Sequence, residues 1–322
     1  MERGPIFLGG ADRSGKTLMR LLLASHPSIA MTRRANLWFR FYGQYGDLGE
    51  EANFERCLGA LLAYKHVARL EPDAERVRRE FWAGEPTYAR LFALIQRQHA
   101  EREGKGRWGD QTGLVERYAE AIFAAYPGAR LVQMVRDPRD RYEAARARHA
   151  RGRGHVGAAT ARWLYSVGLA ARNRRRYPGQ VLVVRYEDLV RQPEATLRAV
   201  CAFLDEPFAP AMLRMDGERG APAPKGPLTP EHMGRYRGRV PARELAFLQL
   251  HAGRAMAALG YPRDRLRLGP AEALRFALAD WPLNLARMLA WRAREAALHR
   301  RSARGGRARR LPGARRGAAG AG

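Results

Sequence analysis

Residues 10–17 carry the residue types that hold a phosphate group. The segment Gly10-Ala11-Asp12-Arg13-Ser14-Gly15-Lys16-Thr17 matches the pattern GxxxxGK(S/T) at every fixed position, between a short apolar run and a stretch with helical spacing. Glycines in such a turn let successive backbone N–H groups point at one anion, and the N-terminus of the following helix adds its positive end. We therefore expect the loop to bind a phosphate-bearing ligand. Its expected ligand-binding residues are Arg13, Ser14, Gly15, Lys16 and Thr17.

A second anion site is expected at Arg136. The apolar run 131–135 has the character of a buried parallel strand, which places Arg136 at the carboxyl edge of the sheet, where open α/β sheets hold their ligands. The next residues, Asp137 and Pro138, suit the N-cap and the first position of a helix. Local chemistry leaves two equal alternatives here: an arginine held beside a helix N-terminus to grip an anion, and a well-capped helix with surface arginines.

A third segment begins with the β-branched run Val181-Leu182-Val183-Val184, which predicts a strand. Arg185-Tyr186-Glu187-Asp188-Leu189 follows as a turn, and a helix is expected from Pro193 to Leu204. Ordinary α/β architecture explains this order, so the segment taken alone assigns no chemistry.

In combination and in this order, the three segments resemble the sulfotransferases that use 3′-phosphoadenosine 5′-phosphosulfate (PAPS), nearest to the tyrosylprotein and bacterial branch. Residues 13–20 with His26-Pro27 are similar to the 5′-phosphosulfate loop of that family, 136–140 (RDPRD) to its 3′-phosphate motif, and 184–189 (VRYEDL) to its third characteristic segment. The resemblance spans about residues 5–262. It implies transfer of a sulfuryl group from PAPS to a hydroxyl or amine acceptor.

The resemblance also implies a role for each matching residue. Arg13 and Lys16 would hold the leaving phosphate and the sulfuryl oxygens, Arg136 the 3′-phosphate, and Tyr186 the nucleotide. Lys225 is the nearest candidate for a lysine that helps to close the site over the nucleotide. No metal site is expected, because the leaving group is a single phosphate that the loop already holds.

The residue that takes the acceptor's proton is not apparent from the family pattern. The positions that depart from the pattern are Lys16 for a threonine, Gln111 for a lysine, Ala144 for a phosphate-binding serine and Arg34 near the place of a glutamate base. Asp110 is the first candidate for the base, because it would end a short strand near the loop, and Asp12, inside the loop, is the second. The predicted catalytic residues are Arg13, Lys16 and Asp110.

Two other functions are open on the sequence. The GxxxxGK(S/T) pattern also occurs in ATP- or GTP-dependent kinases and NTPases. These enzymes need Mg²⁺ and an Asp that follows an apolar strand. Asp137 occupies such a position, although Arg136 stands between it and the strand. The departures at Gln111 and Ala144 also suit a non-catalytic relative that binds the nucleotide and transfers nothing. The aromatic-rich segment 38–45 lines either an acceptor cleft or the core.

Short apolar strands that alternate with helical patterns predict an α/β fold, with a P-loop-type central parallel sheet flanked by helices. We assign residues 1–265 to this domain and 266–322 to a basic tail, with one or two amphipathic helices at 271–299 and disorder at 300–322. The expected helices of the domain are 15–25, 53–64, 72–81, 86–102, 114–125, one from Pro138, 158–176, 193–204 and 242–259.

The net charge of +26 selects no partner by itself. Only four of the 58 basic residues are lysines, which indicates a compositional bias, so no specific nucleic acid is expected. In the tail, apolar residues among arginines suit either an anionic membrane surface or packing onto the domain. These residues are Trp281, Leu285, Met288, Leu289 and Trp291.

The cysteines and the hydropathy indicate a location. Cys57 and Cys201 lie in segments with helical spacing and without a CxxC pair, so we expect two small buried hydrophobic residues. No segment has the pattern of a secretory signal, and none is apolar for long enough to span a bilayer. We expect a cytoplasmic protein, peripheral to the membrane if the tail binds one.

Overall fold

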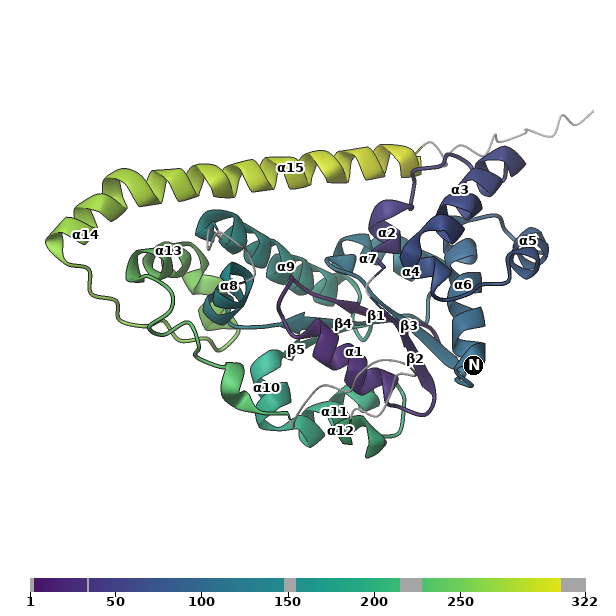
Figure 1. Cartoon of the computed structure of the whole chain (residues 1–322), viewed down its shortest axis with the longest axis horizontal. Helices are drawn as coiled ribbons and strands as arrows, with labels where there is room; N and C mark the ends of the chain where they lie inside the picture. The colour runs from purple at the N-terminus through teal and green to yellow at the C-terminus, as the bar shows by residue number, and fades with distance from the viewer. Residues whose placement is uncertain (1–2, 34, 148–154, 215–227, 308–322) are drawn as a thin grey trace, which may run out of the picture.

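The computed structural model describes residues 3–33, 35–147, 155–214 and 228–307. Within these residues, a parallel sheet with the strand order β2-β3-β1-β4-β5 lies at the centre of the molecule (Figure 1). The strands are β1 (Ile6–Gly9), β2 (Ile29–Thr32), β3 (Arg107–Gln111), β4 (Arg130–Val135) and β5 (Val181–Arg185). The predicted α/β fold with a central parallel sheet is confirmed.

Strand β1 shows how the sheet is buried on both faces. Its side chains alternate, so that Phe7 packs into one core cluster with Trp38 and Trp108, while Ile6 and Leu8 pack into another cluster on the opposite face. The Phe7 and Trp108 rings meet edge to face, with their centroids 5.9 Å apart. A strand covered on both sides requires a continuous apolar run, which is the pattern that predicts it.

Separate groups of helices cover the two faces (Figure 1). One face carries α2 (Leu37–Arg40), α3 (Glu51–Ala63), α4 (Lys65–Ala68), α5 (Ala74–Trp82), α6 (Tyr88–Arg102), the 3₁₀ turn η1 (Val115–Tyr118) and α7 (Ala119–Ala125). The other face carries α1 (Lys16–Ala24), α10 (Tyr186–Arg191), α11 (Pro193–Phe203) and α12 (Ala211–Arg214). A third cluster, beside β4 and β5, contains α8 (Pro138–Arg146), α9 (Val156–Arg176) and α13 (Ala242–Ala258), with the short turn η2 (Pro230–His232) nearby.

Two local predictions were wrong, and one strand was not predicted at all. The unpredicted strand is β2 (Ile29–Thr32), which is short and pairs with β3, a segment far away in the chain. The helix expected over 114–125 begins instead as the 3₁₀ turn η1, since Leu114 has a φ of 58°. The turn expected after β5 is the short helix α10.

The C-terminal segment is helical further than predicted. Helix α14 (Pro270–Arg275) continues through a π-helical turn, η3 (Phe276–Asp280), into the long helix α15 (Trp281–Arg307). Residues 300–307, for which we expected disorder, continue α15, and residues 308–322 lie outside the described residues. In the described part of the chain, no helix has both the length and the apolar character needed to cross a bilayer.

Helix α15 packs along α9 (Figure 1). The two helices approach closely at Gly157, where an added Cβ would lie 2.0 Å from the carbonyl oxygen of Asn284. Further along, Glu295 on α15 forms a largely buried ion pair with Arg117, at 2.6 Å. One side of α15 is thus attached to the domain.

Candidate functional site

The loop between β1 and α1 uses backbone conformations that glycine adopts most readily. Gly10 and Gly15 have φ angles of +118° and +93°. A Cβ at Gly10 would lie 2.2 Å from the carbonyl oxygen of Met134, and one at Gly15 would lie 2.5 Å from Cδ2 of Tyr186. The loop is therefore pressed between β4 and α10, and this contact fixes where its N–H groups and the N-terminus of α1 point.

Two further loop residues have their side chains directed back at the loop itself. Lys16 is buried, and its Nζ donates hydrogen bonds to the carbonyl oxygens of Gly10 and, at 3.2 Å, of Ala11. Ser14 is also buried, and its Oγ donates to the carbonyl oxygen of Ala11 at 2.8 Å. Thr17, one residue into α1, is exposed. The ammonium group of Lys16 is thus held over the loop rather than in solvent.

Opposite charges meet beside Gly113. A Cβ at Gly113 would lie 3.6 Å from Oδ1 of Asp12, 3.7 Å from Nζ of Lys16 and 3.8 Å from Oδ1 of Asn36. The other carboxylate oxygen of Asp12 pairs with Arg162 of α9 at 3.0 Å. A carboxylate, an ammonium and an amide therefore surround one point at the mouth of the loop. No sequence pattern had indicated the contribution from Asn36.

Arg136 reaches the same loop from the end of β4. Its Nη1 donates to the carbonyl oxygen of Arg13 at 3.4 Å, and its Nη2 to that of His232 at 2.5 Å. The guanidinium lies over the ring of Tyr186, 4.4 Å from the ring centroid. Because Gly15 lies against the edge of the same ring, the structure brings the backbone of Arg13 and Gly15 together with the side chains of Arg136 and Tyr186. Burial raises the pKa of Tyr186, so its hydroxyl stays neutral.

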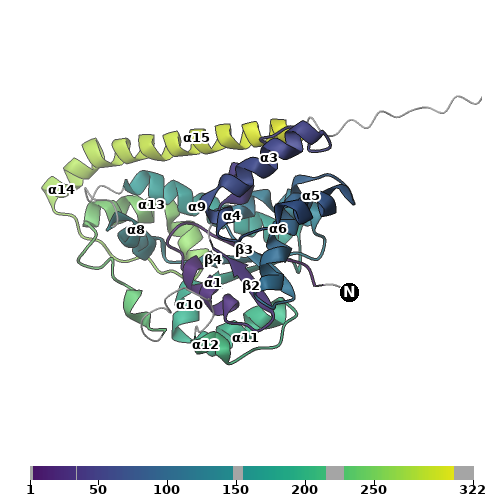
Figure 2. The same cartoon turned by 45° about the vertical axis from the view of Figure 1, so that its right-hand side comes forward.

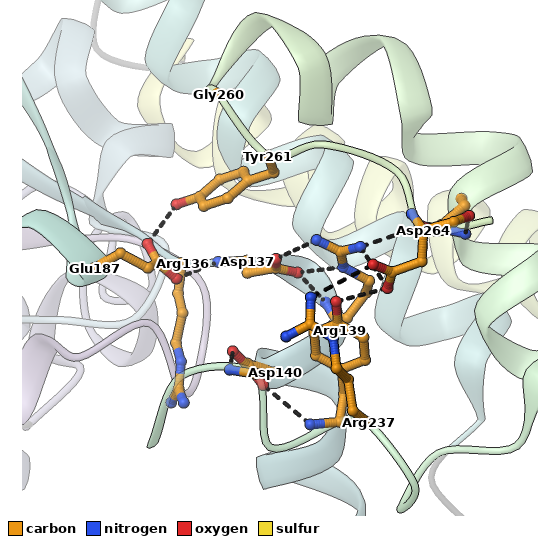
Figure 3. A network of polar contacts seen from close by, with 12 residues as sticks. Arg136, Asp137, Arg139, Asp140, Glu187, Arg237, Gly260, Tyr261 and Asp264 are labelled. Carbon is orange, nitrogen blue, oxygen red and sulfur yellow. Dashed lines mark hydrogen bonds and ion pairs between the residues drawn. The ribbon is translucent and has the colours of Figure 1, made fainter. Parts of the chain in front are cut away.

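The carboxylates that follow Arg136 hold its surroundings in place (Figure 3). Asp137 caps α8 by accepting a hydrogen bond from the backbone N–H of Arg139 at 2.9 Å. Asp140 is buried, which raises its pKa, and it accepts hydrogen bonds from the backbone N–H groups of Gly234, at 2.7 Å, and Tyr236, at 3.1 Å. The segment that follows η2 is thereby attached to α8, next to the carbonyl that Arg136 contacts.

Glu116 is a positioning residue that sequence reasoning missed. Its side chain is fully buried, and Oε2 accepts a hydrogen bond from the backbone N–H of Gly10 at 3.0 Å. Its Oε1 accepts from Ser166 Oγ at 2.6 Å and from Gln133 Nε2 at 3.2 Å. Glu116 therefore orients the backbone N–H of Gly10, the first glycine of the GxxxxGK(S/T) pattern. No sequence signal marked it, because its partner Gly10 lies 106 residues away.

Asp110 and Asp12, the two candidates for the base, have different environments. Asp110 lies in β3 with no exposed surface, and it accepts hydrogen bonds from Thr32 Oγ1 at 3.1 Å and Thr112 Oγ1 at 2.7 Å. Burial raises the pKa of Asp110 from 3.8 to about 6, against the effect of both threonines. The side chain of Asp12 is 35% exposed. The described geometry makes Asp12 the more accessible carboxylate, and the catalytic role of Asp110 stays a prediction.

Replacing Asp110 with asparagine should stabilise the fold at neutral pH. The folded state binds the Asp110 proton more tightly than the unfolded chain does, so stability falls as the pH rises from about 3.8 to about 6. Above that window the buried carboxylate lowers the free energy of unfolding by about 2–3 kcal/mol. Asparagine carries no charge and avoids this loss. Urea unfolding of both proteins across the window measures the difference. A difference in unfolding free energy that does not grow with pH would contradict the buried-carboxylate explanation.

The other residues singled out from the sequence add no contact to the described site. Lys225 and Arg34 fall outside the described residues. Trp38 and Phe41 are buried in the core, which favours the core interpretation of the aromatic segment. Among the residues that the structure describes, no group of three or more His, Cys, Asp or Glu side chains lies close enough to hold a metal ion.

Comparison with known proteins assigns these features to one family. Residues 5–210 match the model of the sulfotransferase family. The chain belongs to the sulfotransferase family. The match contains the loop, Arg136 and Tyr186, whereas α13 and α15 lie beyond it. The loop, Arg136 and Tyr186 thus all lie within the sulfotransferase-family domain.

Individual relatives are distant. A protein-tyrosine sulfotransferase of Drosophila melanogaster is 24% identical over 258 residues, which are 73% of this chain and 47% of that protein. The chain therefore spans about half the length of this curated relative.

Solved structures share the fold. The sulfotransferase domain of the Synechococcus PCC 7002 olefin synthase superposes with a TM-score of 0.58 at 22% identity, covering 80% of this chain and 96% of that domain. A sulfotransferase domain from the curacin biosynthetic pathway gives a TM-score of 0.54 at 17% identity, covering 81% of this chain and 99% of that domain. These likenesses establish the architecture of the sulfotransferase-family domain.

Proposed function

We propose that this sulfotransferase-family protein moves the sulfuryl group of PAPS to a hydroxyl or amine acceptor. The observation that carries the proposal is the meeting of two basic elements at Tyr186: Gly15 of the loop lies against its ring edge, and Arg136 lies over its face. A nucleotide with one phosphate on its 3′ position and another on its 5′ position presents two anions on either side of one ribose. Two separate cationic elements close together suit that ligand better than a single triphosphate chain.

The residues present fit such a nucleotide. In the described part of the chain, Nε of Arg136 is buried without a hydrogen-bond partner, and a buried N–H left in this state is costly unless a ligand accepts from it. We assign the 3′-phosphate to Arg136 and the base or ribose to Tyr186. The 5′-phosphate and the sulfuryl oxygens belong to the loop N–H groups, Arg13 and Lys16. Lys225 remains the predicted closing lysine.

The chain's own residues supply what sulfuryl transfer requires. PAPS supplies an activated sulfuryl group whose leaving group is a phosphate. Asp12 takes the acceptor's proton as the new bond to sulfur forms and the bond from sulfur to the phosphate oxygen breaks. Lys16 and Arg13 hold the departing phosphate, a form of charge stabilisation worth on the order of 10²–10³ in rate per donor. The exposure of Asp12 and its position beside Lys16 and Gly113 favour it over Asp110.

Thermal unfolding with the desulfonated product, 3′-phosphoadenosine 5′-phosphate, tests the proposal. At a hundred times its dissociation constant the bisphosphate should stabilise the fold by about 2.7 kcal/mol, and without added metal. Stabilisation by ATP with Mg²⁺ alone would instead support the kinase interpretation, which has no support in the family match. Binding of the bisphosphate without transfer of label from PAPS to any acceptor in a broad panel would identify a non-catalytic relative.

A cytoplasmic location stays a prediction of this proposal. Cys57 and Cys201 are free and buried, as expected from the sequence, and neither forms a disulfide. Free thiols suit a reducing compartment. Fractionation of cells that express the full chain would test the prediction.

A further inference from the structure

Helix α15 presents two different sides. On its inner side, which faces the domain, Asn284, Met288 and Glu295 are buried, and Trp291 contacts Tyr165 of α9 with ring centroids 5.7 Å apart. Figures 1 and 2 show α15 along one edge of the molecule, with most of the domain beneath it and α3 near its C-terminal end. The opposite side of the helix therefore faces outward.

The outward side of α15 is apolar along four turns. Residues advance by about 100° in an α-helix, so the positions opposite Asn284 and Met288 form one stripe. All of its members are exposed and none is charged: Pro282, Leu283, Ala286, Leu289, Ala290, Ala293, Ala296 and Ala297. Leu283 and Leu289 are 50% and 53% exposed. We call these eight residues the outer face of α15.

The exposed apolar surface continues on the preceding turns. Leu274 of α14 is 61% exposed and Leu278 of η3 is 72% exposed. Several large exposed leucines on one continuous helical element differ from the single exposed apolar residues that any soluble surface carries. This surface requires a partner of matching polarity.

Arginines border the outer face. By the same helical geometry, Arg292 lies on one edge, and Arg287 and Arg294 lie on the other. The nearest acids are engaged on the inner side, where Asp280 pairs with Arg243 and Glu295 pairs with Arg117. These two acids therefore do not neutralise the arginines that border the outer face. In the sequence, residues 299–322 add eight arginines and no acid.

We propose that the outer face of α15 binds the surface of an anionic lipid bilayer, with the helix lying in the plane of the interface. Leucines enter the boundary between headgroups and acyl chains, and the bordering arginines contact lipid phosphates. A second copy of the chain is a poorer occupant, because it would bring the same arginines to the same edges and place like charges opposite one another. An anionic bilayer provides both an apolar interior for the leucines and negatively charged phosphates for the arginines.

The apolar part of the proposal is tested with full-length protein and sedimented vesicles. The chain should bind vesicles that are roughly one third phosphatidylglycerol in phosphatidylcholine at least tenfold more strongly than vesicles of phosphatidylcholine alone. The double variant Leu283→Gln/Leu289→Gln should lower binding to the anionic vesicles by about tenfold or more. Leu250→Gln, which changes an exposed leucine on α13, is the matched control and should bind as the parent chain does. Both leucines are exposed, so thermal unfolding of the double variant should stay unchanged.

The charge part has its own pair of variants. Arg292→Gln/Arg294→Gln should lower binding to anionic vesicles by about tenfold, while Arg191→Gln/Arg198→Gln, on α10 and α11, should not. Equal binding to neutral vesicles, or unchanged binding of the leucine variant, would overturn the proposal and leave the terminal arginines as the binding segment. A concentration-dependent dimer in size-exclusion chromatography that the leucine variant abolishes would also overturn it, in favour of a second copy. The bisphosphate assay is independent of all these outcomes.

Discussion

Replacing Arg136 with alanine should abolish the stabilisation of the fold by 3′-phosphoadenosine 5′-phosphate and lower turnover on the order of 10²–10³-fold. Arg136 lies over Tyr186 and contacts the backbone of the loop, so its guanidinium lies beside the loop. In the proposed site, its loss removes the fork assigned to the 3′-phosphate and leaves the loop to hold the nucleotide alone. Thermal unfolding with and without the bisphosphate measures the binding effect, and transfer of label from PAPS measures turnover.

Two controls separate binding from folding in this experiment. Arg136→Lys keeps the charge but not the planar fork, and we expect a partial thermal shift from it. Arg198→Ala removes an exposed arginine on α11 that pairs with Glu194, and it should leave the shift intact. A full shift by the bisphosphate in Arg136→Ala would remove Arg136 from the nucleotide site.

Replacing Asp12 with asparagine should lower turnover on the order of 10²–10⁴-fold while the bisphosphate still stabilises the fold. Asp12 adjoins Lys16 and Asn36 at the mouth of the loop and is partly exposed, so an acceptor hydroxyl can reach it. Asparagine keeps the size of the side chain but does not accept the proton. Rates of sulfuryl transfer with a panel of phenol and alcohol acceptors, beside the thermal shift, separate loss of chemistry from loss of nucleotide binding.

The Asp12 experiment has two matched comparisons. Arg162→Gln breaks the ion pair to Asp12 but leaves its carboxylate, so turnover should fall less than in the Asp12 variant. Asp110→Asn should retain most of its turnover, since Asp110 is fully buried between two threonine hydroxyls. The reverse ranking, with Asp110→Asn inactive and Asp12→Asn active, would establish Asp110 as the base.

Part of this site follows from local chemistry. The glycines of the loop are required where the backbone has positive φ, as at Gly10 and Gly15, and a pattern of fixed spacing reveals such positions. Arg136 was placed at the carboxyl edge of the sheet because a continuous apolar run predicts a buried strand. These features depend on residues within a few positions of one another, which is the range over which sequence patterns operate.

Other parts required the tertiary structure. Glu116 and Asn36 join the site through partners far away in the chain, and β2 exists through its pairing with β3. The burial of Asp110 likewise depends on what folds over it, although its type and position in the chain suggested a base.

The long C-terminal helix combines a feature that local sequence determines with one that tertiary contacts decide. Its sequence indicated a basic amphipathic helix, because the α-helical period is local. Only packing decided which side would face the domain: the close approach at Gly157 and the ion pair of Glu295 with Arg117 turn Asn284 and Met288 inward and Leu283 and Leu289 outward. Periodicity specifies the faces of a helix, but the partner that buries one of them is chosen by contacts between distant parts of the chain.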